Sequence, residues 1–411
     1  MKKLMILGAA SGQMPFITIA KARGYHTIVV SPKGDYPGFD VADKAYYFDT
    51  RDKEHILEAA RAEKIDAITT DQTDVAVPTV AYVAEKLGLR GIGSDVAEKF
   101  TNKYKMRLAA AEAGVSIPKF AHAKNLSEAT GIGDSIGYPL IIKPVDNSGS
   151  RGIYKIHSTE ELKQRFPDAL AFSANSEVIL EQCLSGPGYL ADGFAMGGEY
   201  HTLDVGKKEN FEGQNLFASS RCIYQSPASD LPEILRKVVE TNDKLIRSMK
   251  LPFGITHADY IHNIADGKIY LVECAARGGG IFISSHIMPM VSGFNTNEAL
   301  LEFLVEGTEK KVNPQTLDTN AAAWLCFGLE GGVIENISGL EKLENINEVK
   351  NIFIDMHVGE EIKTLRDNTT KLGPILLKSH STLSIERAME EIKNTLKIQT
   401  RNEAGLHDII W

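Results

Sequence analysis

The first ninety or so residues alternate short apolar runs with segments of helical periodicity. The helical segments lie at residues 15–24, 53–64 and 75–88. Continuous apolar strands separated by helices are typical of a parallel sheet covered by helices on both faces. We therefore expect a doubly wound α/β domain over residues 1–93, with strands at 4–9, 27–31, 45–49 and 66–70.

A second unit is expected over residues 94–305, with a smaller lobe at about 115–185. Thr101 or Asn102 can cap a helix that Gly114 ends. A long amphipathic helix is expected at 231–249, before a pair of strands at 254–263 and 268–277.

The pattern changes again from about residue 306. Apolar stretches with the alternation of antiparallel strands are followed by an amphipathic helix at 384–397. We expect residues 306–411 to form a C-terminal antiparallel α+β domain, with strands within 324–337, 349–362 and 373–381.

Length and composition agree with a soluble globular chain of about three packed units. The 411 residues contain 45 basic and 54 acidic side chains, for a net charge of -9, without a basic block. Nucleic acid is therefore not expected as a partner. The four cysteines are isolated, which fits a reducing cytoplasm, and no segment is long enough to span a membrane. The apolar N-terminus passes directly into a periodic segment, so we interpret it as a strand and not a signal peptide.

Lys143 ends an apolar run and is followed by a glycine-rich polar loop, DNSGSRG. The glycines let several backbone N–H groups turn toward one point, while Ser148, Ser150 and Arg151 add donors. Such a loop beside an ammonium group suits a phosphate. The alternative is a solvated hairpin loop, and the pattern alone does not separate the two.

Asp259 and Glu273 flank the turn Ala265-Asp266-Gly267. A three-residue hairpin loop there would set the two carboxylates opposite each other on one face of the sheet. Like charges in that position require neutralisation, and hard oxygen ligands beside phosphate suit Mg²⁺. An exposed acidic hairpin is the alternative. Arg277 and the glycines that follow it form a second anion-ready element.

Taken in order, these segments resemble the ATP-grasp superfamily of ligases over nearly the whole chain. The distinctive stretches are NKYKM, YPLIIKPVDNSGSRG, EQCLSGPGY and ADYIHNIADGKIYLVECAARGGG. The resemblance implies that Lys103 and Lys143 contact ATP phosphates and that Ser148, Gly149, Ser150, Arg151 and Gly152 form the loop that closes over them. It implies adenine contacts for Glu181, Gln182, Cys183 and Leu184, metal binding by Asp259 and Glu273, and a catalytic role at the phosphoryl group or substrate carboxylate for Arg277.

Three positions depart from the usual motifs of the superfamily. Asp259 stands where glutamate is commoner and offers its carboxylate on a shorter side chain. Gly188 stands where many relatives carry a glutamate that contacts the ribose, and Ala275 stands where an asparagine metal ligand is usual. Fewer protein ligands are therefore expected around a second metal ion.

The resemblance implies an ATP- and Mg²⁺-dependent ligase, with Mn²⁺ as a possible substitute, that forms an acyl phosphate and joins it to an amine. Amino-acid-like substrates are the first expectation, and phosphoribosylamine substrates of purine pathways are the second. A nucleotide-binding module without catalysis is the alternative. His257 and His286 are the candidate bases, although packing roles are the simpler interpretation. Proteins of this kind commonly form homodimers.

Overall fold

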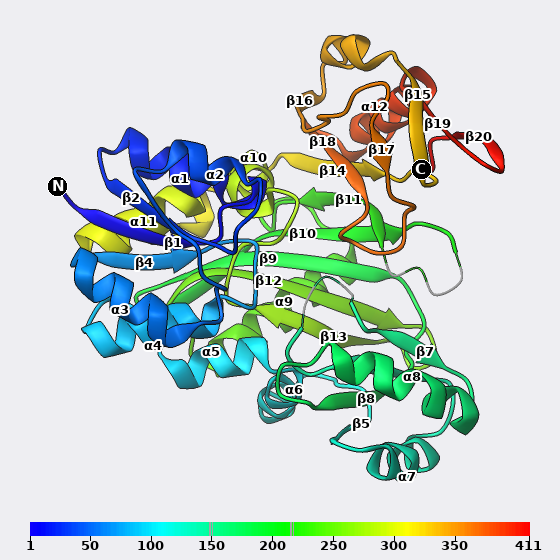
Figure 1. Cartoon of the computed structure of the whole chain (residues 1–411), viewed down its shortest axis with the longest axis horizontal. Helices are drawn as coiled ribbons and strands as arrows, with labels where there is room; N and C mark the ends of the chain where they lie inside the picture. The colour runs from blue at the N-terminus through cyan, green and yellow to red at the C-terminus, as the bar shows by residue number, and fades with distance from the viewer. Residues whose placement is uncertain (148, 150, 214–215, 217) are drawn as a thin grey trace.

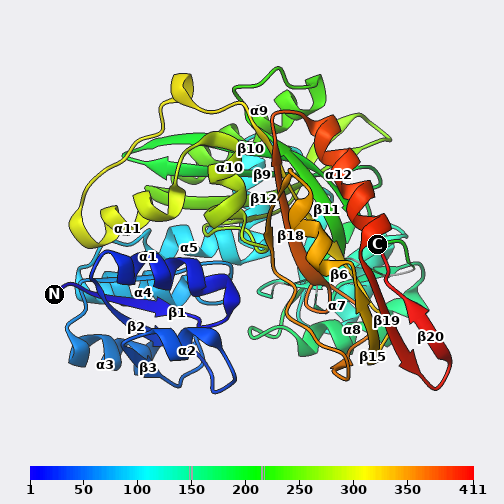
Figure 2. The same ribbon diagram turned by 90° about the horizontal axis from the view of Figure 1, so that it is seen from above.

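The computed structural model describes residues 1–147, 149, 151–213, 216 and 218–411. The parallel N-terminal sheet, the small antiparallel lobe and the C-terminal elements surround a large central sheet (Figure 1). Seen from above, the N-terminal and C-terminal elements lie on opposite sides of the molecule (Figure 2). No helix in the described ranges is long and apolar enough to cross a membrane.

The N-terminal unit is a four-stranded parallel sheet with the order β3-β2-β1-β4. Alternate residues of β1 enter different cores: Leu4 and Ile6 pack in one cluster, Met5 and Leu7 in another. The sheet is thus buried on both faces, which explains its continuous apolar strands. The expected parallel α/β fold is confirmed, with elements β1 (Lys3–Leu7), α1 (Met14–Ala22), β2 (His26–Val30), α2 (Pro37–Val41), β3 (Lys44–Tyr46), α3 (Lys53–Glu63), β4 (Ala67–Thr70) and α4 (Val77–Leu87).

Two helices lead from this unit into the small lobe: α5 (Ser94–Thr101) and α6 (Lys103–Glu112). Asn102 caps α6, because its side chain accepts a hydrogen bond from the backbone N–H of Lys105 at 3.0 Å. The small lobe is an antiparallel sheet with the order β5-β8-β6-β7, whose helices pack against one face. Its elements are β5 (Phe120–Ala123), α7 (Leu126–Ile136), β6 (Leu140–Pro144), β7 (Tyr154–Ile156), α8 (Thr159–Ala171) and β8 (Val178–Gln182).

The central sheet has eight strands in the order β13-β12-β9-β10-β11-β14-β18-β16. Its helices α9 (Glu233–Met249), α10 (Met288–Ser292) and α11 (Thr296–Glu306) lie in the second unit, as does a π-helical turn at Ile283–Ile287. Three of its strands belong to the segment after residue 306, so the expected boundary there runs through one continuous sheet. The strands are β9 (Gly188–Met196), β10 (Glu199–Asn210), β11 (Ser219–Gln225), β12 (Phe253–Asn263), β13 (Lys268–Ala275), β14 (Ala321–Phe327), β16 (Val349–Ile352) and β18 (Leu372–Ser379).

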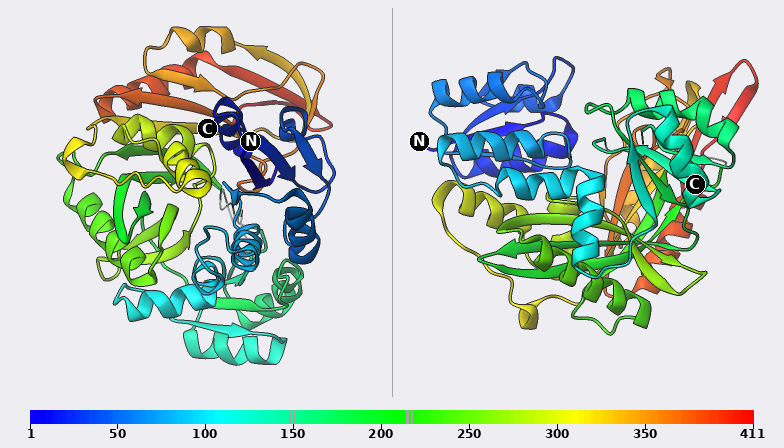
Figure 3. Two further views of the ribbon diagram at one scale, coloured as in Figure 1. Left: turned by 90° about the vertical axis from the view of Figure 1, so that its left-hand side faces the viewer. Right: turned by 90° about the horizontal axis from the view of Figure 1, so that it is seen from below.

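The C-terminal segment also has a core of its own. Helix α12 (Thr382–Thr395) packs against β14 and β18, and a second antiparallel sheet has the order β17-β15-β19-β20. The turned views show these elements stacked beside the central sheet (Figure 3). The remaining elements are β15 (Gly332–Ser338), β17 (Glu361–Ile362), β19 (Lys397–Asn402), β20 (Gly405–Asp408) and short 3-10 turns at Ser11–Gln13, Pro314–Thr316 and Leu340–Asn345.

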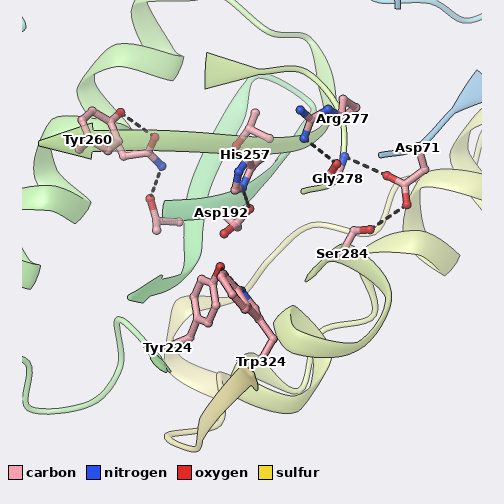
Figure 4. Close-up of polar contacts among 12 residues, drawn as sticks. Asp71, Asp192, Tyr224, His257, Tyr260, Arg277, Gly278, Ser284 and Trp324 are labelled. Carbon is pink, nitrogen blue, oxygen red and sulfur yellow. Dashed lines mark hydrogen bonds and ion pairs between the residues drawn. The ribbon is translucent and has the colours of Figure 1, made fainter. Parts of the chain in front are cut away.

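A buried polar network fixes α9 to the central sheet. Asn242 is fully buried, and its Nδ2 donates to Tyr200 Oη at 2.8 Å and to Thr202 Oγ1 at 2.9 Å. Its Oδ1 accepts from Tyr260 Oη at 2.9 Å, the contact seen beside Tyr260 in Figure 4. The amide nitrogen and the amide oxygen of Asn242 are thus both hydrogen-bonded to side chains of the central sheet. These bonds fix β12 relative to α9.

The Asn242→Ala variant is expected to lose about 3 kcal/mol or more of unfolding free energy, because buried hydroxyl groups lose their partners. Urea denaturation monitored by fluorescence measures the loss. Thr241→Ala, which removes a neighbouring hydroxyl that donates to the carbonyl of Lys237, serves as the control. Equal stabilities of the two variants would contradict the role given to Asn242.

Candidate active site

A cavity of about 720 Å³ lies between the small lobe and the central sheet, with walls also from the N-terminal and C-terminal segments. It brings together nearly all of the site residues expected from the sequence. Those that line it are Lys103, Lys143, Gly149, Arg151, Glu181, Gln182, Cys183, Leu184, Asp259, Glu273 and Arg277. Gly152 is not among the lining residues, and Ser148 and Ser150 lie outside the described residues.

Asp259 and Glu273 are directly opposite each other on β12 and β13, as expected. The predicted three-residue loop is wrong, however: the strands end at Asn263 and begin again at Lys268, which leaves four residues in the turn. The register shifts back at a bulge that leaves Val272 without a strand partner. The extra residue in the bulge compensates for the extra residue in the turn, so the two acids share one face.

Each of these carboxylates is held by a lysine. Lys103 Nζ lies 2.7 Å from Glu273 Oε1, and Lys208 Nζ pairs with Asp259 Oδ2. Asp259 Oδ1 is buried and has no hydrogen-bond partner among the described residues. An orphaned carboxylate oxygen beside a second carboxylate suits a hard divalent cation. Among the described residues no group of three or more His, Cys, Asp or Glu side chains could hold a metal ion. Further ligands would therefore come from water or substrate oxygens.

Gly188 lies opposite Lys208 in the pairing of β9 with β10. A Cβ atom at position 188 would lie 2.7 Å from Lys208 Cε. The glycine therefore leaves room for the aliphatic part of Lys208 as its ammonium group reaches Asp259.

Lys143 is the last residue but one of β6, and the glycine-rich loop begins three residues later at Asp146. Its Nζ lies 2.7 Å from Glu181 Oε2, and burial lowers the pKa of Lys143 more than this carboxylate raises it. Lys103 Nζ donates to the backbone carbonyl of Asn147, in the loop, at 2.6 Å. Gly149 has a φ of +72°, a conformation that favours glycine. Two ammonium groups thus stand at the base of the loop.

Arg107 is a site residue that the sequence did not reveal. It is fully buried, its Nε donates to Glu181 Oε1 at 2.6 Å, and its Nη2 donates to the bulged carbonyl of Val272 at 2.6 Å. Burial would raise the pKa of Glu181, but the charges of Arg107 and Lys143 lower it to about 2. Both carboxylate oxygens of Glu181 are thus paired with cations.

Arg277 is held by the N-terminal unit. Its Nη2 lies 2.5 Å from Asp74 Oδ2. Asp71 accepts from the backbone N–H of Gly278 at 2.9 Å and from Ser284 Oγ at 2.8 Å (Figure 4). The two acids follow β4, and the carboxyl ends of parallel strands are where ligand sites form. The stretch DQTD after β4 was therefore the sequence signal for these residues.

The two candidate histidines differ in position. His257 lines the cavity, and its Nδ1 lies 2.7 Å from Oδ1 of the buried Asp192 (Figure 4). His286 is not among the lining residues; it packs edge-on against the stacked rings of Phe282 and Phe353, where burial lowers its pKa. The packing interpretation thus fits His286.

Asp71 predicts a pH dependence of stability. Burial raises its pKa from 3.8 to about 6, so in this interval the folded state holds a proton that the unfolded chain has released. The contribution of Asp71 to the stability of the wild type therefore falls as the pH rises from about 4 to about 6. Relative to the wild type, Asp71→Asn is expected to gain about 3 kcal/mol between pH 4 and pH 7.

Denaturant unfolding across this pH range measures the difference. Asp43→Asn is the control, because hydrogen bonds from Lys21 and Thr27 lower the pKa of Asp43 to about 2 and its difference from the wild type should be flat between pH 4.5 and 6.5. Parallel curves for Asp71→Asn and the wild type would contradict the prediction.

Two family models match the chain: an ATP-grasp domain at residues 136–285 and an L-amino acid ligase C-terminal domain 2 at residues 326–401. Alanine–anticapsin ligase of Bacillus subtilis is 30% identical over 280 residues, which are 62% of this chain and 57% of that protein. The carbamoyl phosphate synthase large chain of Thermotoga petrophila is 23% identical over 310 residues, 72% of this chain and 28% of that protein. The chain thus spans less than two thirds of these curated relatives.

The crystal structure of L-amino acid ligase from Bacillus licheniformis superimposes with a TM-score of 0.82 at 24% identity, covering 98% of this chain and 99% of that one. This similarity shows a shared fold along the whole chain. The chain therefore contains an ATP-grasp domain followed by an L-amino acid ligase C-terminal domain 2, which confirms the resemblance inferred from its motifs.

Proposed function

We propose that this protein is an ATP- and Mg²⁺-dependent ligase that activates a substrate carboxylate as an acyl phosphate and joins it to an amine of an amino-acid-like substrate. One observation carries the proposal: Lys103, Lys143, Asp259, Glu273 and Arg277 line a single cavity. Phosphate-binding cations, a metal-binding pair of carboxylates and an anion-binding arginine are the groups that phosphoryl transfer to a carboxylate requires.

Asp259 and Glu273 would hold Mg²⁺, or Mn²⁺ in its place, and the orphaned Asp259 Oδ1 supports that assignment. A divalent ion would neutralise charge on the phosphate oxygens and orient them. Lys208 and Lys103, which now pair with these two acids, would then be released toward the phosphates.

The remaining residues bind and orient the reactants. Lys143 and Lys103 hold the phosphates of ATP against the glycine-rich loop, while the backbone of residues 182–184 holds adenine at the junction of the lobes. A carboxylate oxygen of the first substrate attacks the γ-phosphorus, and ADP leaves. The amine nitrogen of the second substrate then attacks the acyl carbon, phosphate leaves, and the nitrogen loses a proton. Arg277, oriented by Asp74, stabilises negative charge on the transferred group.

Two similarities support amino-acid-like substrates: the match to an L-amino acid ligase C-terminal domain, and the similarity to alanine–anticapsin ligase, whose name includes an amino acid. The phosphoribosylamine alternative has no comparable support in the C-terminal segment. The third alternative is a nucleotide-binding module without catalysis, and the following assay distinguishes it from a ligase.

The purified protein is to be assayed for ADP and phosphate release with Mg-ATP and pairs of the twenty common L-amino acids. We expect release that depends on an amino acid, with a product of combined mass minus water in mass spectrometry. ATP binding without turnover on any acceptor would overturn the ligase and favour the module.

Glu273→Gln is expected to lower turnover and to weaken Mn²⁺ binding about 100-fold or more, because an ion pair partner of the metal becomes a neutral amide. Electron paramagnetic resonance of Mn²⁺ with a non-hydrolysable ATP analogue measures the affinity without turnover. Asp266→Asn, in the turn of the same hairpin but outside the cavity, is the matched control. Unchanged Mn²⁺ affinity in Glu273→Gln would refute the metal assignment.

A further inference from the structure

The C-terminal segment contributes one wall of the cavity. Asn368, Thr369 and Lys371, which precede β18, line it together with Trp324 of β14. A Cβ atom at Gly149 would lie 3.4 Å from the Thr369 side chain, so this wall reaches the glycine-rich loop. The wall thus completes the cavity, although no motif of the sequence pointed to it.

Lys371 in this wall is a cation with no counter-ion in the part of the chain that the structure describes. Its Nζ donates to the backbone carbonyl of Ser219 at 3.2 Å and lies 4.8 Å from the centre of the Trp324 ring. Among the described residues it forms no ion pair within 4 Å. Five other cations of the site each pair with an acid: Lys103 with Glu273, Lys143 and Arg107 with Glu181, Lys208 with Asp259, and Arg277 with Asp74.

The surroundings of Lys371 make the lack of a carboxylate costly. Burial lowers its pKa, and the charge of Lys208 lowers it further. A cation in such a place is stabilised when an anion enters. The Trp324 ring against which Lys371 lies is also held in place. Its Nε1 donates to Tyr224 Oη at 3.2 Å, and the two rings lie side by side in Figure 4.

We propose that Lys371, over the face of Trp324, binds the free carboxylate of the amine-bearing substrate. The inference rests on the proposed ligase function and specifies its second substrate as an amino acid with an unmodified carboxylate. Such a substrate keeps its negative charge throughout the condensation. A cation that neither the nucleotide nor Asp259 and Glu273 engage would neutralise that charge.

Position distinguishes this role from phosphate binding. Lys103 and Lys143 act electrostatically on Glu181 and Glu273, beside the glycine-rich loop. Lys371 instead directly precedes β18 and lies over the ring of Trp324, on β14. Arg277 is a less suitable partner for the carboxylate, because Asp74 already neutralises its charge. Lys155, another lining lysine, lies on β7 of the small lobe.

The test compares each of the twenty common L-amino acids with its own amide as the amine-bearing substrate. The amide keeps the nucleophile and the side chain but lacks the negative charge. We expect Lys371→Met to raise the KM of the acid about 10- to 100-fold, the cost of a lost charged hydrogen bond. The KM values of the amide and of ATP should change less than about threefold.

Two further variants serve as controls. Lys371→Arg keeps the charge and should retain most of the affinity for the acid. Lys378→Met removes the same charge from β18 outside the cavity and should behave as the wild type. Unchanged amide kinetics in Lys371→Met also show that the variant is folded.

Equal loss for the acid and the amide in Lys371→Met would overturn the inference and indicate a structural role. A raised KM for ATP alone would overturn it in favour of phosphate binding. Absence of any turnover in the wild type would instead count against the proposed function.

Calorimetric titration of the acids and amides into protein with Mg²⁺ and a non-hydrolysable ATP analogue needs no turnover. A preference for acids that Lys371→Met abolishes supports the subsite, and no preference in the wild type refutes it.

Discussion

The architecture of the site depends on one electrostatic constraint: Asp259 and Glu273 face each other across adjacent strands. Two carboxylates in this position repel unless cations neutralise them. In this structure Lys208 and Lys103 supply that neutralisation. One lysine comes from the central sheet and the other from the helix that leads into the small lobe, so neutralising the pair also ties the lobes to one cavity.

The same balance of charge extends around the cavity. Glu181 lies between Arg107 and Lys143, and Asp74 neutralises Arg277. Buried ion pairs seldom add much stability over apolar packing, but removing one partner leaves a costly unpaired charge. A ligand that carries phosphates, carboxylates and divalent ions can exchange with these pairs at little electrostatic cost. This gives the cavity the properties of a site for a highly charged reaction.

The segments at the two ends of the chain enclose the chemistry. The turn after β4 holds Gly278 through Asp71 and Arg277 through Asp74. At the other end, β14 and β18 extend the central sheet, which places Trp324 and Lys371 in the cavity wall. Because the sheet is continuous across residue 306, the C-terminal segment cannot move independently of the strands that carry Asp259 and Glu273 without breaking ladder hydrogen bonds.

The sequence by itself determined the local elements and the chemistry of the motifs. Apolar runs predicted the four parallel strands, Asn102 predicted a cap, and the segments around Lys143, Asp259 and Glu273 indicated the superfamily. These features were readable because each depends on neighbours within a few residues. The sequence correctly predicted that Asp259 and Glu273 lie opposite each other, but from a three-residue turn. The structure has a four-residue turn, and a bulge at Val272 compensates for the extra residue. Only the tertiary structure decided that compensation, the pairing of Glu181 with Arg107, and the entry of Asp74 and Lys371 into the cavity. The contacts of Glu181, Asp74 and Lys371 join residues dozens to hundreds of positions apart, and their energies depend on burial and partner charges that no local pattern encodes.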